Sequence, residues 1–277
     1  IMLVVTKIDE LQKILKKKNI NLRTSLVPTM GNLHSGHLKL ISEAFKVSDF
    51  VSASIFVNPL QFNPDEDFAN YPRSLEADLS KLEKNGCSLA FIPKSEELIE
   101  GIVKESADGY LSSILCGNTR ENHFDGVVTI VNKLFELFNP NIALFGEKDY
   151  QQLMIVKHFV ERKKLNLKIY GVPTEREING LAKSSRNTYL TQVEKERASL
   201  IYKMLQNSKE LILKSKELDD VLRDGLKFLK DNGFEVDYFE ARCSKTLKPI
   251  ASSDDVILLC AAQISSVRLI DNLRVKS

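Results

Sequence analysis

The sequence lacks the features that mark several classes of protein. Its four cysteines lie at least 17 residues apart and none belongs to a CxxC pair, so neither a cysteine zinc site nor a redox dithiol is indicated. No apolar run approaches the length of about 18 residues that a membrane-spanning helix needs. The apolar run after Met2 is too short for a signal peptide. We therefore expect a cytoplasmic protein without a membrane segment.

Neither sign of charge is in excess. There are 39 Lys and Arg residues against 37 Asp and Glu, a net charge of +2. A protein that binds nucleic acid through many phosphates carries a basic surplus, so no nucleic-acid partner is expected. The run Lys16-Lys17-Lys18 is predicted to be the solvated C-terminal end of an amphipathic helix, where basic side chains interact favourably with the helix dipole.

What is present is an ordinary globular composition, 43% hydrophobic and 27% charged over 277 residues. Short apolar runs, typical of parallel strands buried on both faces, occur at residues 25–29, 51–57, 88–92, 142–145 and 167–172. Helical periodicity lies between them at about 36–48, 74–85, 124–138 and 149–162. This alternation predicts an α/β domain with a doubly wound parallel sheet over residues 1–175.

The pattern changes after about residue 176. Helical segments at about 192–214 and 217–231 precede strand-like runs at 236–242, 256–261 and 267–270. Helices followed by a small sheet predict a second, smaller α+β domain over residues 176–277. No linker rich in Pro, Gly or Ser marks the boundary, so its position depends on the change of pattern alone.

The most informative stretch is VPTMGNLHSGHLKL, residues 27–40. A predicted strand ends at Thr29, and His34 and His37 follow where a helix begins. That spacing puts both imidazoles on one helical face beside the unpaired backbone N–H groups of the helix start, which is a favourable place for an anion. Two alternatives are a purely structural role and a metal site, although zinc would need a third protein ligand.

HSGH resembles the HIGH signature that class I aminoacyl-tRNA synthetases share with nucleotidylyltransferases, which activate substrates at the α-phosphate of ATP. Further segments are similar to those of the pantothenate synthetase (pantoate–β-alanine ligase) family, in the same order and spacing over nearly the whole chain. They are SIFVNPLQF (54–62), YPRSLEAD (71–78), FGEKDYQQL (145–153), GLAKSSRNTYL (180–190) and RLIDN (268–272).

The resemblance implies a Rossmann-like ATP domain with a smaller C-terminal lid domain, in a cytoplasmic homodimer. It also implies a two-step ligation in which pantoate attacks Mg²⁺-bound ATP to give pantoyl adenylate and pyrophosphate. β-Alanine then attacks the adenylate to give pantothenate and AMP. Mg²⁺ would come with ATP, and no tightly bound protein metal is expected.

The resemblance assigns roles residue by residue. ATP-binding positions are Met30, Gly31, His34, His37, Gly146, Lys148, Asp149, Lys183, Ser184, Ser185 and Arg186. Of these, His34, His37, Lys148 and Arg186 are the expected catalytic residues, because attack of one anion on another needs positive charge and hydrogen-bond donors. Pantoate or β-alanine would contact Asn58, Gln61, Tyr71 and Gln152. Simpler readings are an ordinary polar turn for KSSRN, a helix N-cap for Asp149, and packing for Asn58 and Tyr71.

Several positions depart from the family pattern. Ala77 stands where some relatives carry aspartate, which leaves Asp78 as a doubtful metal ligand. Cys116 replaces an acidic residue and Glu121 a proline, whereas Arg120 and His123 keep their places and are predicted to line the approach of β-alanine.

Lys183 replaces an apolar residue. Its ammonium is predicted to contact the β- or γ-phosphate, the alternative being a stem that covers apolar surface while the head reaches water.

Two other functions stay open on the sequence alone. One is a HIGH-type adenylyltransferase that acts on a different small acid. The other is a non-catalytic nucleotide-binding protein, against which the intact HSGH, GEKD and SSRN segments and both glutamines argue.

Overall fold

The computed structural model describes residues 1–17, 21–64, 66–251 and 255–276. The chain forms two compact units, one of residues 1–147 with 155–173 and the other of residues 148–154 with 174–277. The expected division into two domains after residue 175 stays a prediction.

The first unit is built on a six-stranded sheet in the order β1-β4-β3-β2-β5-β6, in which every pairing is parallel. The strands are β1 (Leu3–Val5), β2 (Thr24–Thr29), β3 (Phe50–Ile55), β4 (Leu89–Phe91), β5 (Ile142–Gly146) and β6 (Lys168–Val172). Chain order reverses between β2 and β5, and ligands of open α/β sheets bind where the carboxyl ends of such strands meet.

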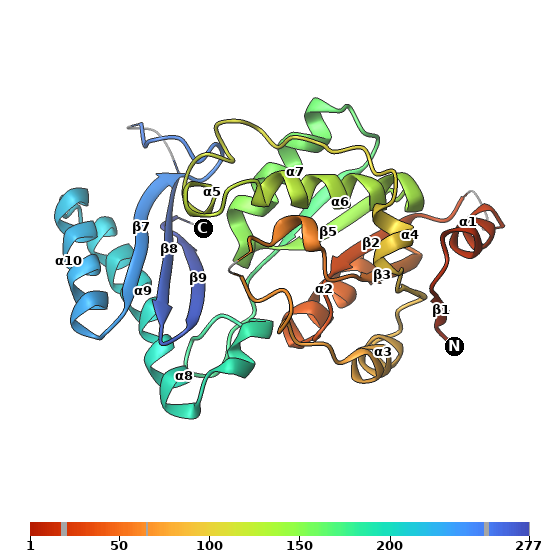
Figure 1. Cartoon of the computed structure of the whole chain (residues 1–277). Coiled ribbons are helices and arrows are strands. Elements are labelled where there is room, and N and C mark those ends of the chain that lie inside the picture. The colour runs from red at the N-terminus through yellow and green to blue at the C-terminus, as the bar shows by residue number, and fades with distance from the viewer. Residues whose placement is uncertain (18–20, 65, 252–254, 277) are drawn as a thin grey trace. The chain divides into compact units, whose positions relative to one another are not determined.

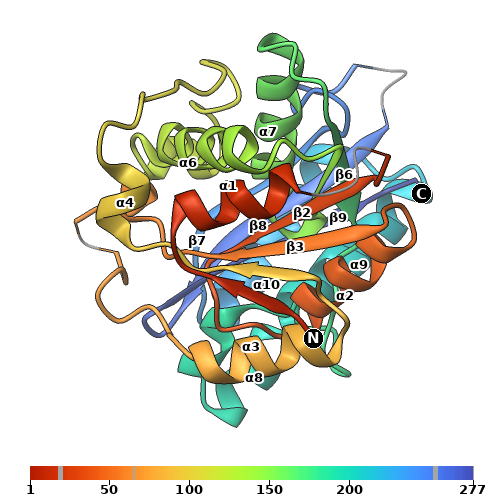
Figure 2. The same ribbon diagram turned by 90° about the vertical axis from the view of Figure 1, so that its right-hand side faces the viewer.

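Helices cover both faces of this sheet (Figure 2). Helices α2 (Ser35–Phe45) and α3 (Leu75–Lys84) lie on one face, and α1 (Ile8–Lys16) and α6 (His123–Phe138) on the other. Shorter helices are α4 (Ser95–Ile99) and α5 (Cys116–Thr119), and α7 (Tyr150–Arg162) joins the unit from Ile155 onward. The doubly wound α/β prediction is confirmed.

Helix α6 also reaches the 3₁₀ turn η1 (Pro59–Gln61) that follows β3. Gly126 makes this approach possible, because a Cβ there would lie 2.1 Å from the carbonyl oxygen of Leu60. The close packing of α6 against η1 therefore depends on a glycine inside an otherwise strongly apolar helix.

The second unit has helices α8 (Gln192–Ala198), α9 (Leu200–Leu213) and α10 (Leu218–Asp231). An antiparallel sheet follows, with strands β7 (Glu235–Cys243), β8 (Val256–Ile264) and β9 (Val267–Arg274). Helices α9 and α10 pack against the sheet, as Figure 1 shows. Their core includes Met204, Leu205, Leu229, Phe239 and Leu258. The predicted α+β character of this region is confirmed.

One detail differs from the sequence-based expectation, and the predicted helix end at Lys16 and Lys17 is confirmed. The single helix expected at 192–214 is divided at Ser199, whose hydroxyl donates to the Glu196 carbonyl at 2.7 Å and so favours a bend. Helix α1 ends at Lys16 with Lys17 as its C-cap, and Lys18 lies outside the described residues. No helix in the described ranges combines the length and apolar character needed to cross a bilayer.

Candidate active site

His34 and His37 lie together at the start of α2. His34 is the N-cap of the helix, and its Nδ1 accepts a hydrogen bond from the Gly36 N–H at 3.2 Å. The His34 N–H in turn donates to Nδ1 of His37 at 3.2 Å, and the two ring centroids are 4.1 Å apart. The two imidazoles are thus fixed to the backbone and to each other.

These contacts determine which ring nitrogens can donate. Since Nδ1 of each imidazole accepts from a backbone N–H, the neutral ring carries its proton on Nε2. The expectation that the helix start offers unpaired N–H groups is wrong at His34 and Gly36, because both groups bond to imidazoles. The Nε2–H group of each neutral ring is therefore its hydrogen-bond donor.

The loop before His34 is held by Asp78 of α3. The carboxylate accepts from the Asn32 N–H at 2.8 Å, from the Leu33 N–H at 2.7 Å and from the Ser74 hydroxyl at 3.1 Å. Gly31 adopts φ +83°, where a Cβ would lie 3.2 Å from the Asp78 carboxylate and 3.1 Å from Ile55. The glycine and the carboxylate together shape the turn that leads to HSGH.

This use of Asp78 does not fit a metal ligand. The side chain is 1% exposed, and both of its oxygens accept hydrogen bonds from the loop or from Ser74. Among the described residues, no three His, Cys, Asp or Glu side chains are grouped so that they could hold a metal ion.

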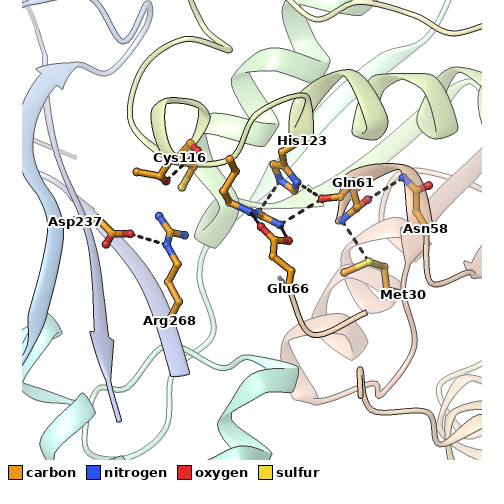
Figure 3. A network of polar contacts seen from close by, with 10 residues as sticks. Met30, Asn58, Gln61, Glu66, Cys116, His123, Asp237 and Arg268 are labelled. Carbon is orange, nitrogen blue, oxygen red and sulfur yellow. Dashed lines mark hydrogen bonds and ion pairs between the residues drawn. The ribbon is translucent and has the colours of Figure 1, made fainter. Parts of the chain in front are cut away.

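Gln61 lies at the end of η1, close to the loop that precedes HSGH. Its Oε1 accepts from Asn58 Nδ2 at 3.0 Å, and its Nε2 donates to the sulfur of Met30 at 3.3 Å (Figure 3). Asn58 is buried and also donates to the Gly126 carbonyl at 3.0 Å. The structure therefore brings together three of the predicted site residues, Met30, Asn58 and Gln61.

A second set of side chains holds the main chain of Gln61. Nδ1 of His123 lies 2.7 Å from the Gln61 carbonyl, and Nη1 of Arg120 lies 2.9 Å from His123 Nε2. Arg120 pairs with Glu66 through Nε at 2.6 Å and Nη2 at 2.5 Å. Sequence reasoning did not find Glu66, since no local pattern links it to a residue 54 positions away.

Tyr71 is buried, and its ring packs edge-on against Phe62 with centroids 5.9 Å apart. This contact fits the packing alternative weighed for Tyr71, and the expected ligand contact stays a prediction.

In the second unit, Lys148 and Asp149 form a side-chain pair at 3.3 Å. The Lys148 carbonyl accepts from Asn272 Nδ2 at 3.0 Å. Gln152 lies half-buried in the first turn of α7. Gly146 ends β5 in the first unit, with open space where a Cβ would stand.

The KSSRN segment begins with an ion pair that the sequence did not predict. Lys183 Nζ contacts Glu177 Oε2 at 2.8 Å, and the Lys183 N–H donates to the Glu175 carbonyl at 2.9 Å. Neither arrangement weighed for Lys183 included this pair. Ser184 then caps the 3₁₀ helix η3 (Ser185–Tyr189) by accepting from the Arg186 N–H at 3.3 Å. The segment is thus more ordered than a plain polar turn.

A buried ion pair anchors the chain just before KSSRN. Arg176 contacts Asp271 of β9 at 2.6 and 2.9 Å and lies over the Tyr202 ring, 3.6 Å from its centroid. Burial raises the pKa of the Asp271 carboxyl, and the Arg176 guanidinium opposes that rise. Asp271 and Asn272 thus link β9 to the segments that carry Lys183 and Lys148. Their RLIDN motif belonged to the resemblance, but nothing in the sequence indicated these partners.

The chain is similar in sequence to proteins of one family over nearly its whole length. The profile of the pantoate-beta-alanine ligase family matches residues 3–274. A pantothenate synthetase of Acinetobacter baumannii is 46% identical, covering 90% of this chain and 89% of the relative. One of Chromohalobacter salexigens is also 46% identical, covering 91% of each chain.

Two solved structures are similar to the whole of this chain. The crystal structure of pantothenate synthetase from Thermus thermophilus matches with a TM-score of 0.94 and 39% identity, over 100% of both chains. That of pantoate-beta-alanine ligase from Francisella tularensis, complexed with beta-gamma ATP and beta-alanine, has a TM-score of 0.85 and 31% identity, over 100% of this chain and 99% of that one. This chain belongs to the pantoate–β-alanine ligase family.

Proposed function

We propose that this chain ligates pantoate and β-alanine to pantothenate in two steps that consume ATP and release pyrophosphate and AMP. The observation that carries the proposal is the contact between Gln61 and Met30. The Gln61 amide, to which we assign pantoate, contacts the loop that leads to His34 and His37, to which we assign the phosphates. An amide both donates and accepts, as a ligand with a carboxylate and hydroxyls requires.

In the first step, a carboxylate oxygen of pantoate attacks the α-phosphorus, and the bond to the bridging oxygen of the β-phosphate breaks. Negative charge grows on the phosphate oxygens. The Nε2–H groups of His34 and His37 are oriented by the backbone before the reaction, so they stabilise that charge without a reorganisation cost. Lys148, Lys183 and Arg186 supply positive charge, and Ser184 and Ser185 supply hydroxyl donors.

In the second step, the amine of β-alanine attacks the acyl carbon of pantoyl adenylate, and AMP leaves as the C–O bond breaks. The Francisella tularensis relative was solved with beta-alanine, which supports this substrate. We assign pantoate to Gln61 and Gln152 with Asn58 and Tyr71 nearby in sequence motifs. The nucleotide is assigned to Met30, Gly31, Gly146 and Asp149.

Mg²⁺ is proposed to arrive with the ATP phosphates, because Asp78 is committed to the loop before His34. We further propose a cytoplasmic homodimer in which residues 1–175 bind ATP and pantoate. Residues 176–277 would carry the mobile phosphate-binding segment.

The test is pyrophosphate release from ATP with pantoate, with and without β-alanine. We expect a burst of about one equivalent per active site without β-alanine and continuous release with it. Release with another small acid but not with pantoate would favour a different adenylyltransferase. Tight ATP binding with no pyrophosphate under any condition would indicate a non-catalytic nucleotide-binding protein.

A further inference from the structure

His123 and Arg120 contact the main-chain carbonyl of Gln61, and Glu66 holds Arg120. We propose that Glu66, Arg120 and His123 are positioning residues that set the affinity for pantoate by fixing the main chain of Gln61. The proposal rests on the assignment of pantoate to Gln61.

The need for such residues follows from the local backbone. Gln61 is the last residue of η1, and a carbonyl at a helix end has no intrahelical partner. His123, the first residue of α6, supplies the partner through Nδ1 at 2.7 Å, and Arg120 adds a longer contact from Nη2 at 3.4 Å. The orphan carbonyl is thereby satisfied from another element.

The hydrogen-bond roles in this chain of contacts are unambiguous. A carbonyl only accepts, so Nδ1 of His123 carries the proton and donates to Gln61. A guanidinium only donates, so Nε2 of His123 accepts from Arg120 at 2.9 Å. Glu66 then holds Arg120 by a two-point contact, which fixes its plane as well as its position.

The side chain of Gln61 is oriented by a separate pair of contacts. Asn58 donates to Oε1 at 3.0 Å, and Met30 accepts from Nε2 at 3.3 Å (Figure 3). With the backbone held by His123 and the amide held by Asn58, Gln61 presents its remaining N–H in one direction. Preorganisation of this kind lowers the entropic cost of binding a ligand.

These contacts also limit what Arg120 can do for β-alanine. Of the five N–H groups of a guanidinium, four are engaged, by Glu66, His123 and the Gln61 carbonyl. Both ring nitrogens of His123 are engaged too. We therefore expect their loss to affect pantoate rather than the β-alanine carboxylate.

The experiment is steady-state kinetics of Arg120→Lys and Glu66→Gln, with each substrate varied in turn. We expect the KM for pantoate to rise about tenfold, with the KM values for ATP and β-alanine within about twofold, because the ligand must now order Gln61 itself. His123→Asn keeps a donor at the place of Nδ1 and should stay within about threefold of the wild type. His123→Leu has no donor there and should raise the KM for pantoate by about tenfold or more.

The matched control is Arg162→Lys, since Arg162 fixes the carbonyls of Ser106 and Ala107 elsewhere in the same unit and should leave all KM values unchanged. A rise confined to the KM for β-alanine would overturn the inference in favour of a β-alanine site. Equal rises in the KM values for all three substrates, or equal KM values for the two His123 variants, would contradict the inference. They would show that Glu66, Arg120 and His123 only stabilise the fold. If the wild-type protein releases no pyrophosphate with pantoate, the proposed function itself fails, which is a distinct outcome.

Discussion

At the scale of single residues, His34 has two separable duties. Its Nδ1 caps α2, and its Nε2–H is the group that we propose donates to phosphate. Asparagine is also a good N-cap but has no donor at the place of Nε2.

We predict that His34→Asn and His34→Ala both lower kcat for adenylation by about 10²–10³, the usual cost of one preorganised donor. Only the alanine variant should also lose about 0.5–2 kcal/mol of stability through the lost cap. Pyrophosphate release and urea unfolding measure the two effects. Equal stability of the two variants would show that the N-cap hydrogen bond does not stabilise the protein. Near-normal adenylation rates would show that His34 has no catalytic role.

Lys183 carries a charge where the resemblance to the family implies an apolar residue. The ammonium is paired with Glu177 at 2.8 Å, so phosphate must compete with that carboxylate. Glu177 is 42% exposed, which makes the pair weak enough to exchange.

We predict that Lys183→Met raises the KM for ATP several-fold at low salt, with an effect that shrinks as ionic strength increases. Glu177→Gln should lower the KM for ATP, because it removes the competitor. Initial rates at about 20 and 500 mM salt provide the test. If neither variant changes the KM for ATP, the Glu177 pair is the whole role of Lys183.

At the scale of elements, helix α3 acts as a support for the HSGH loop. Asp78 receives the Asn32 and Leu33 N–H groups, and Lys81 Nζ donates to the Leu33 carbonyl at 2.6 Å. One turn of helix thus holds both polar groups of the same loop residue.

We predict that Asp78→Asn costs about 1–3 kcal/mol of stability, because an amide leaves a buried loop N–H without its acceptor. The Mg²⁺ concentration that gives half-maximal activity should not change. Urea unfolding and a Mg²⁺ titration of the rate separate the two roles. A large increase in the Mg²⁺ requirement would instead make Asp78 a metal ligand.

Helix α8 begins with a capping box that extends to the β8–β9 turn. The Ser265 hydroxyl and the Thr191 N–H and hydroxyl all donate to the Glu194 carboxylate, and they lower its pKa from 4.5 to about 2. A pKa that is lower in the folded state means that the ionised carboxylate stabilises the fold.

This contribution is therefore complete above pH 4.5 and is lost as the pH falls toward about 2. We predict that Glu194→Gln flattens the decline of the urea midpoint over that window and leaves the curve at lower pH unchanged. Ser265→Ala should shift the decline to higher pH, because Ser265 contributes the largest part of the pKa change. Parallel curves for wild type and Glu194→Gln would contradict the prediction.

At the scale of the whole molecule, the sequence predicts the layers of helices and strands better than the side-chain contacts between residues far apart in the chain. The parallel strands were recognisable because burial on both faces leaves nearly continuous apolar runs. The break at Ser199 was not, since both flanking helices keep apolar periodicity. The HSGH and KSSRN segments were found through local motifs, whereas the groups that hold them were not. Asp78 and Leu33 are 45 positions apart and Arg176 and Asp271 are 95 apart, so only the fold pairs them.

The second unit has a hydrophobic core of its own, drawn entirely from residues between Leu181 and Val275. It also includes residues 148–154, which contribute Tyr150. This side chain is buried, its hydroxyl donates to the Ser244 carbonyl at 2.7 Å, and Arg274 donates to it at 3.0 Å. A fragment of residues 174–277 thus keeps its core but lacks the buried Tyr150 side chain and the two hydrogen bonds of its hydroxyl group.

We predict that the 174–277 fragment folds cooperatively, with the circular dichroism of three helices and a small sheet. The comparison chain joins 148–154 to 174–277 through a Gly/Ser linker as long as the segment that it replaces. The fragment should be about 3–5 kcal/mol less stable than this linked chain, because that is the usual cost of deleting a large aromatic side chain from a core. Thermal and urea unfolding of the two chains measure the difference, and Tyr150→Ala in the linked chain should abolish it. A non-cooperative melt for both chains would show that this unit folds only with the parallel sheet, and the predicted division of the chain near residue 175 would then be wrong.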